Sequence, residues 1–414
     1  MYHKQYSVLW IFVVVLLSCQ STSKKINQRD LHIINFDNIE QKQGFLYSSL
    51  FDSVKVIALS SEDVTLSKIT KMETYGSYLV ILDSYQAKGV YLFDLDGNFL
   101  RRYGNVGFGP EEYHSCDDFT IDESKSELYI YDKISKRALV FNLKTGAYIK
   151  TLDLKNAQID RIRVIDGKLY GVLTNFHPSW YGEENPYILK ELSMKDGKVL
   201  NQWFKMDSFN KGWPGLLSET SLFYKIDGGK ELFSYGLSDS ILCFDRGKIY
   251  PYLVMEGERI VNVNDFNEKE RNISEITDVM ERTQIELDMM YRLGNGKEKI
   301  LFVSDIFLKG SKLYFQCQLW GSRYIVYDTV NGSLEIFINR NDDVFFKERP
   351  SSMILPQFKV GNSKGVFYEY SLDMLYQLSF FYEKDMISNK VRNKEALKNI
   401  NEDSNPVILY YEFK

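Results

Sequence analysis

A short unit of three β-strand patterns and one glycine turn recurs along this chain, and no other feature limits its fold as strongly. The clearest copy spans residues 78–103. It consists of an apolar strand that ends in an aspartate, a second such strand, the turn Asp96-Gly97-Asn98 and a third strand. Valine, isoleucine and aromatic residues dominate the strands and favour β structure. Since an Asp-Gly pair suits a tight hairpin, the unit predicts a small antiparallel sheet.

Further copies follow at intervals of about 45 residues, a period typical of propellers. One small sheet cannot bury both of its faces, so the copies must pack face to face in a ring. We therefore predict an all-β fold, a six-bladed β-propeller of four-stranded antiparallel blades. The predicted blades are Ser67–Tyr103, Asp117–Leu154, Ile159–Met206, Ser221–Met255, Ile300–Phe337 and Met353–Phe380.

Segments outside the blades complete this architecture. Two strand patterns, Val54–Leu59 and Val407–Phe413, are expected to pair and close the ring, because closure removes an open sheet edge. Residues 267–293 carry apolar residues at helical spacing, which predicts an inserted helix between blades four and five. We expect this helix to pack against the flank of the propeller, and docking on a partner is the alternative. The lysine-rich segment Glu383–Asn401 predicts a second helix.

The run GNVGFGPEEY at Gly104–Tyr113, placed after the first hairpin, resembles the six-bladed β-propeller lipoproteins of Bacteroidetes-type bacteria. Their repeats are similar to NHL repeats, and their loop typically reads G-x-G-x-G-P-G-E-Y, so Glu111 departs from the usual glycine. The segment Asn405–Leu409 resembles the closing strand of the same family. The resemblance covers about residues 51–414. It implies the fold and the lineage, and it implies almost nothing about activity, because most members have no assigned function.

Residues 1–18 have the pattern of a lipoprotein signal peptide. A basic start precedes the apolar run Leu9–Leu17, which is too short for a membrane span. The run ends in Leu16-Leu17-Ser18-Cys19, which resembles a bacterial lipobox, in which the cysteine is acylated and becomes the first residue of the mature chain. The alternative is an ordinary secretory signal that happens to end near a cysteine. We expect a protein of the bacterial cell envelope, anchored to a membrane through Cys19.

Residues 19–50 are predicted to be the lipidated N-terminus and a flexible tether, and residues 51–414 the propeller. No acidic run follows Cys19, which favours the periplasmic face of the outer membrane over the cell surface. The whole chain has 51 Lys and Arg against 56 Asp and Glu, a net charge of −5. This balance argues against a nucleic-acid partner. Cys243 and Cys317 lie in strand patterns and are expected to be buried thiols.

No catalytic signature is present, so we assign no catalytic residue, metal or cofactor. The Asp94–Asn98 run lacks the glycine and glutamate that an EF-hand loop needs at its sixth and twelfth positions. The histidines are scattered without the spacing of a zinc site. Adjacent Asp117 and Asp118 would point to opposite faces of a strand and make a poor catalytic pair. Nucleophile-elbow, P-loop and Rossmann motifs are missing.

Aromatic residues in two long loops and one short motif form the candidate ligand site. Exposed rings beside hydrogen-bonding groups can stack on sugars or bind proteins, although they can equally tuck into the ends of the blades. The loops are 174–186 and 208–220, and the motif is 319–323. The candidate residues are Phe176, His177, Trp180, Tyr181, Trp213, Trp320 and Arg323.

Three functions stay open. The first is a membrane-anchored, non-catalytic binding or scaffold module for a glycan, a peptide or an envelope protein. The second is a propeller-type enzyme, such as a lyase, glycoside hydrolase or lactonase, with a site at the central channel assembled from distant blades. The third is a structural or sensory partner that docks through the inserted helix 267–293. The residues that line the channel would discriminate between the first two.

Overall fold

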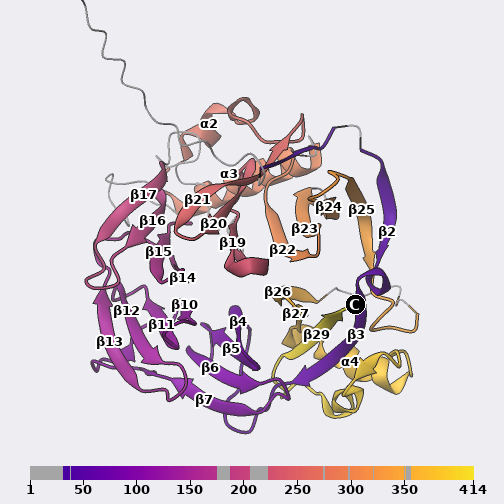
Figure 1. Ribbon diagram of the computed structural model, residues 1–414, viewed down its shortest axis with the longest axis horizontal. Helices are drawn as coiled ribbons and strands as arrows, with labels where there is room; N and C mark the ends of the chain where they lie inside the picture. The colour runs from indigo at the N-terminus through magenta and orange to yellow at the C-terminus, as the bar shows by residue number, and fades with distance from the viewer. Residues whose placement is uncertain are drawn as a thin grey trace, which may run out of the picture.

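The computed structural model describes residues 31–414, with gaps at 38, 175–186, 206–221, 274–275, 297–298, 320, 349 and 351–355. The described strands form six small sheets that follow one another around a central axis (Figure 1). The predicted six-bladed β-propeller is therefore confirmed. The blades contain four or five strands, where four in each were predicted.

Blades 1 to 3 are four-stranded and antiparallel, and within each blade the strand order from the axis outward follows the chain. Blade 1 contains β4 (Lys71–Tyr75), β5 (Tyr78–Asp83), β6 (Gly89–Asp94) and β7 (Phe99–Tyr103). Blade 2 contains β10 (Asp118–Asp122), β11 (Glu127–Asp132), β12 (Arg137–Asn142) and β13 (Tyr148–Asp153). Blade 3 contains β14 (Arg161–Ile165), β15 (Lys168–Val172), β16 (Tyr187–Leu192) and β17 (Val199–Lys205).

Blades 4 to 6 each carry a fifth strand at the outer edge. Blade 4 contains β18 (Phe223–Lys225), β19 (Glu231–Phe233), β20 (Ser240–Asp245), β21 (Lys248–Glu256) and β1 (His32–Asn35). Blade 5 contains β22 (Val303–Lys309), β23 (Lys312–Leu319), β24 (Gly321–Asp328), β25 (Leu334–Asn341) and β2 (Gln41–Leu46). Blade 6 contains β26 (Gln357–Asn362), β27 (Gly365–Tyr370), β29 (Val407–Phe413), β3 (Phe51–Ala58) and β28 (Val391–Arg392).

Blade 6 closes the ring by joining the two ends of the chain. Strand β29 lies between β27 and β3, and Leu409 faces Val56 in the antiparallel β3–β29 pair. The predicted pairing of Val54–Leu59 with Val407–Phe413 is thus confirmed. The Gly-rich loop between blades 1 and 2 contains the short strands β8 (Asn105–Val106) and β9 (Glu112–Tyr113), and it carries the chain from one blade to the next.

The propeller begins earlier in the chain than predicted. Strands β1 and β2 lie within residues 19–50, the predicted tether, and each pairs in parallel with the outermost strand of a blade. Their sequences, HIIN and QKQGFL, lack the alternation that marks a half-buried strand. They join the sheets through main-chain hydrogen bonds and one buried side chain each, Ile34 and Phe45. Residues 19–30 of that tether lie outside the described residues.

The inserted segment between blades 4 and 5 contains two helices, so the prediction of one continuous helix over 267–293 was wrong. Helix α2 (Glu268–Arg271) begins at the capping residue Asn267, and α3 (Val279–Tyr291) begins at Asp278, whose carboxylate accepts a hydrogen bond from the Glu281 amide at 2.8 Å. The apolar side chains of the segment share a buried cluster with the propeller, as expected for packing against its flank. The cluster contains Phe266, Met289 and Leu293 of the insertion with Leu237 and Leu301 of the neighbouring blades.

The second predicted helix, Glu383–Asn401, is also corrected. The helix in this region is α4 (Leu375–Glu383), which ends where the prediction placed a beginning. Asp385 and Asn393 have left-handed backbone angles, with φ of 54° and 58°, and these angles interrupt a continuing helix. The following residues form β28 and a short 3-10 helix over Lys394–Asn399.

Apolar side chains from facing blades form the core between them. Val80 and Leu82 of blade 1 belong to the same buried cluster as Phe119 and Ile121 of blade 2. Cys243 in β20 and Cys317 in β23 are buried, as predicted, and serve as small apolar side chains there. Because the apolar cores lie between the blades, the inner strand of each blade and the turn that follows it surround the central axis.

Candidate functional site: the central channel and its mouth

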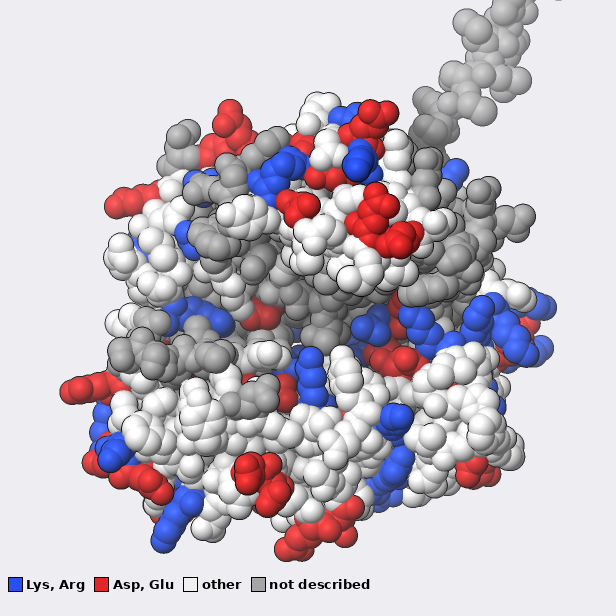
Figure 2. Space-filling view, turned by 180° about the vertical axis from the view of Figure 1, so that it is seen from behind, with Lys and Arg blue, Asp and Glu red and all other residues white. Residues whose placement is uncertain are grey.

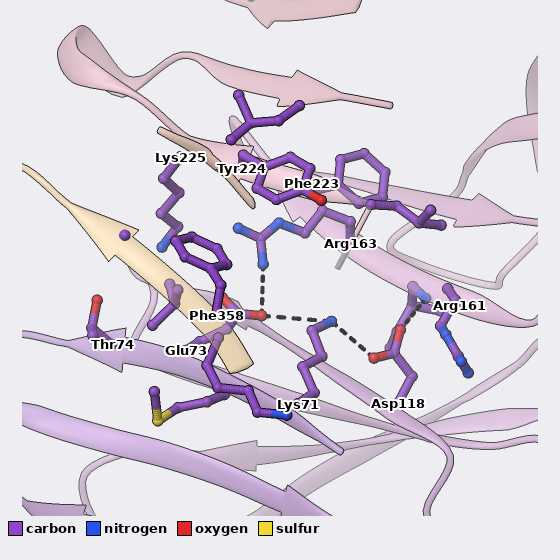
Figure 3. Close-up of a pocket in the computed structure, with 17 residues that line it drawn as sticks. Lys71, Glu73, Thr74, Asp118, Arg161, Arg163, Phe223, Tyr224, Lys225 and Phe358 are labelled. Atoms are coloured by element: carbon purple, nitrogen blue, oxygen red, sulfur yellow. Dashed lines mark hydrogen bonds and ion pairs between the residues drawn. The ribbon is translucent and has the colours of Figure 1, made fainter. Parts of the chain in front are cut away.

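The innermost strands β4, β10, β14, β18, β22 and β26 surround the central axis. Figure 3 shows the space between them, which is lined by basic, acidic and aromatic side chains from several blades. Its free volume is about 40 Å³. A volume of this size holds a few water molecules, and a sugar ring or a peptide side chain would not fit.

A chain of buried ion pairs crosses this space and joins four blades. The Lys71 ammonium lies 2.8 Å from the Asp118 carboxylate and 3.7 Å from that of Glu73. The Arg163 guanidinium lies 2.6 Å from Glu73 (Figure 3). It also lies 2.7 Å from Glu231. Each of these charges therefore has a partner of opposite sign within the chain.

The same pairing holds Glu73 and Arg163 in their charged forms. Burial alone would raise the pKa of Glu73, but Arg163 and Lys71 outweigh burial and hold this pKa below its usual range. Burial alone would lower the pKa of Arg163, but Glu231 and Glu73 outweigh it and raise this pKa further. A carboxylate with a lowered pKa cannot deliver a proton at neutral pH. Glu73 is therefore unsuited to be the general acid of a glycoside hydrolase.

Carboxylates of the channel also bind the backbone of neighbouring blades. Asp118 of β10 accepts a hydrogen bond from the Ile162 amide of β14 at 2.7 Å. Glu369 of β27 accepts one from the Ile69 amide at 3.1 Å and lies 2.7 Å from the Lys359 ammonium. Lys359 in turn donates to the Ile69 carbonyl at 2.7 Å. These contacts tie blade 2 to blade 3 and blade 6 to blade 1, which is a structural role.

The channel widens where the turns after the inner strands gather, and we name this side the inner-turn face. Two hollows of about 560 and 380 Å³ lie there. Both contain Glu123, Lys225 and Ile226, and Lys225 forms an ion pair with Glu123 between them. Hollows of this size fall in the range of small-molecule sites. We call the two hollows together the mouth.

The candidate ligand residues can be placed only in part. Phe176, His177, Trp180, Tyr181, Trp213 and Trp320 lie outside the described residues, as does Cys19. Arg323 lies on β24, is half-buried, and donates a hydrogen bond to Gln41 of β2 at 3.0 Å. It therefore helps to hold the fifth strand of blade 5.

The strands that flank the aromatic segments share one face of the ring. The first four strands of every blade alternate in direction, so β15, β17 and β23 all end at the face opposite the inner-turn face. Figure 2 views the ring from behind and shows Lys and Arg side chains interspersed with Asp and Glu.

The channel residues Lys71, Glu73, Arg163 and Glu231 were not identified from the sequence. A signal was available, because charged side chains alternate with apolar ones in the inner strands β4 and β14, as in Lys71-Met72-Glu73 and Arg161-Ile162-Arg163. Asp118 was considered only with Asp117, whose carboxylate accepts from the Lys133 amide at 2.9 Å, away from the channel chain. In the part of the chain that the structure describes, no group of three His, Cys, Asp or Glu residues could hold a metal ion.

Comparison with known proteins identifies the family. The family model described as Domain of unknown function (DUF4934) matches residues 31–412. The chain belongs to the DUF4934 family. No curated protein matches the sequence. Among the described residues of this DUF4934 protein, no helix is both long and apolar enough to cross a membrane.

A solved structure shares the fold. A Bacteroides fragilis protein assigned as exported is similar with a TM-score of 0.70 at 16% identity, over 92% of this chain and 99% of its own. A member of the DUF4221 family from Bacteroides vulgatus matches with a TM-score of 0.47 at 11% identity, over 88% of this chain and 97% of its own. At such low identity, the first similarity supports the propeller fold of the DUF4934 protein and leaves its activity open.

Proposed function

We propose that this DUF4934 protein is a lipoprotein of the bacterial cell envelope whose NHL-like propeller is a non-catalytic binding module. Its ligand is a glycan, a peptide or another envelope protein. The observation that carries the proposal is the channel, in which Lys71, Glu73, Arg163 and Glu231 neutralise one another and leave about 40 Å³. The narrow part of the channel holds its charges in ion pairs and has room for only a few water molecules, which supports a non-catalytic module.

The proposed anchor is Cys19, at the end of the apolar leader. Two or more acyl chains on one cysteine hold a protein stably on a membrane, whereas one chain binds only marginally. The similarity to a Bacteroides protein assigned as exported supports an envelope location. We place the protein in the outer membrane, with the periplasmic face favoured because no acidic run follows Cys19.

Metabolic labelling with radioactive palmitate tests the anchor. The wild-type chain should incorporate label and fractionate with membranes, and Cys19→Ala should do neither. Recovery of both chains in the soluble fraction, without label, would show that the leader is an ordinary secretory signal and would remove the lipoprotein part of the proposal.

A glycan array and a pull-down from envelope extracts test the binding module, using residues 19–414 with Cys19→Ser. Lys225→Ala probes the mouth, and Trp180→Ala and Trp213→Ala probe the aromatic loops. Weaker binding by Lys225→Ala would place the ligand at the mouth, and weaker binding by a tryptophan variant would place it at the loops. Turnover of a retained glycan into product would contradict the non-catalytic assignment.

A further inference from the structure

The larger hollow of the mouth contains one carboxylate that no cation neutralises among the described residues. This carboxylate belongs to Asp166, which is exposed in the turn between β14 and β15 and accepts a hydrogen bond from the Gly247 amide at 3.2 Å. The other charged side chains described in this wall form ion pairs: Asp122 with Lys125, Glu123 with Lys225, Lys230 with Asp245 and Glu231 with Arg163. The larger hollow is therefore negative at the tip of blade 3.

The smaller hollow carries the opposite charge. Its charged lining residues, among those that the structure describes, are the paired Glu123 and Lys225 and one further lysine, Lys364. Lys364 is exposed in the turn between β26 and β27, and no described carboxylate lies within ion-pair distance of its ammonium. The smaller hollow is therefore positive at the tip of blade 6.

These two uncompensated charges lie on opposite sides of the central axis. Asp166 belongs to blade 3 and Lys364 to blade 6, and three steps around a ring of six blades lead to the opposite blade (Figure 1). The Glu123–Lys225 ion pair separates the two hollows, because both residues line both of them. The mouth thus has a negative end, a neutral middle and a positive end.

Apolar side chains and uncovered main chain form the walls between these ends. Val164, Ile165 and Ile226 line the larger hollow, and Ile226, Phe307 and Leu308 line the smaller one. Phe307 is the only aromatic residue described in these walls and it is buried, so a sugar finds no exposed ring to stack on. Four turn glycines face open space, since an added Cβ atom would meet nothing within 4 Å: Gly76, Gly167, Gly228 and Gly229.

We propose that the mouth binds a short apolar peptide with two free ends, its ammonium at Asp166 and its carboxylate at Lys364. Each end would form a charge-assisted hydrogen bond with the residue of opposite sign. The peptide side chains would contact Ile226 and Leu308, and its main chain would bond to the uncovered turns. This inference rests on the proposed function, because it names the ligand of the same binding module.

Isothermal titration calorimetry tests the assignment, in residues 19–414 with Cys19→Ser. The probes are peptides of two to six alanine and leucine residues, each with free ends, with an acetylated N-terminus or with an amidated C-terminus. The form with free ends should bind most tightly. Each blocking group should weaken binding by about two- to fivefold, the effect of losing one partly exposed ion pair.

Two variants assign the two ends of the peptide. Asp166→Asn should weaken binding of the free-ended peptide as much as acetylation does, and acetylation should have no further effect in this variant. Lys364→Gln should have the same relation to amidation. Both residues are exposed, so both variants should fold. Asp403→Asn and Lys144→Gln, at exposed positions outside the mouth, are the matched controls and should bind like the unmodified chain.

Three results would overturn the assignment. Equal affinity for free and blocked peptides would show that the charges of the mouth do not bind the ends. Binding that depends on free ends but is unaffected by Asp166→Asn and Lys364→Gln would place the peptide elsewhere. Absence of peptide binding, while the array or the pull-down retains a glycan or an envelope protein, would exclude a peptide ligand and leave the binding module intact. Absence of binding in all three assays would overturn the proposed function as well.

Discussion

At the scale of single residues, Gly76 and Gly97 occupy turns of the same blade with left-handed backbone angles. At Gly76 a Cβ atom would meet nothing within 4 Å, whereas at Gly97 it would lie 2.1 Å from the Ala58 carbonyl oxygen. Gly76→Ala should lower the free energy of unfolding by about 1–2 kcal/mol through the backbone angle alone. Gly97→Ala should lower it further, because Ala58 of β3 must move. Urea denaturation of the two variants measures the difference, and equal losses would contradict the close contact.

Two buried carboxyl groups give the stability of the protein a distinct dependence on pH. Burial raises the pKa of Asp342 to about 6 although Tyr411 donates a hydrogen bond to it, and burial raises that of Asp305 to about 6 as well. The unfolded chain has values near 4. Between these two values the native state therefore binds more protons than the unfolded chain. The contribution of the two carboxyl groups to the free energy of unfolding is fully present below about pH 4 and is lost as the pH rises through about 6.

The thermal midpoint should therefore be higher at pH 5 than at pH 7.5. Both pH values lie above the range in which carboxyl groups with lowered pKa values, such as Glu73, take up protons. Asp342→Asn removes one of the two titrating groups and should reduce the difference between the midpoints. A difference of unchanged size in this variant, measured by calorimetry, would show that Asp342 does not titrate in this range.

At the scale of the element, the closing strand β29 supports blade 6 from its centre, because β27 and β3 pair with its two edges. Leu409 of β29 is fully buried between them, whereas Leu100 of β7 is 42% exposed. Leu409→Ala should lower the free energy of unfolding by about 2–5 kcal/mol through the cavity that it leaves. Leu100→Ala, the same change at an outer edge, should lower it by less than about 1 kcal/mol. Similar losses in chemical denaturation would argue against a central role for β29.

The elements that the sequence predicted well are those whose signals are local. The turn at Asp94–Asn98 is one example: Asp94 accepts hydrogen bonds from the Asp96 and Asn98 amides at 2.9 Å each, and Gly97 takes a φ of 91°. Strands β1 and β2 gave no such signal, because the outer edge of a blade sets their conformation. The inserted helix was wrongly predicted as continuous, because its apolar spacing hid the second helix start at Asp278.

At the scale of the whole molecule, the channel could not be predicted from local patterns. Lys71, Asp118, Arg163 and Glu231 lie on four different blades and meet only when the ring forms. Strand periodicity predicts that blades exist, and it contains no information about which inner side chains face one another across the axis. The prediction of the candidate ligand site was limited in the same way. That β15, β17 and β23, the strands before its aromatic segments, end at one face of the ring is known only from the strand directions in the structure.

The central claim is that the charged residues of the channel hold the blades together and perform no chemistry. The free energy of unfolding of Arg163→Met tests it most directly, because this change leaves Glu73 and Glu231 buried without their shared partner. We predict a loss of about 3–5 kcal/mol, the usual effect of breaking a buried ion pair. Most of this loss should be recovered when Glu73→Gln and Glu231→Gln are added. An Arg163→Met protein as stable as the wild type, or more stable, would contradict the claim, because charges kept for function typically reduce stability.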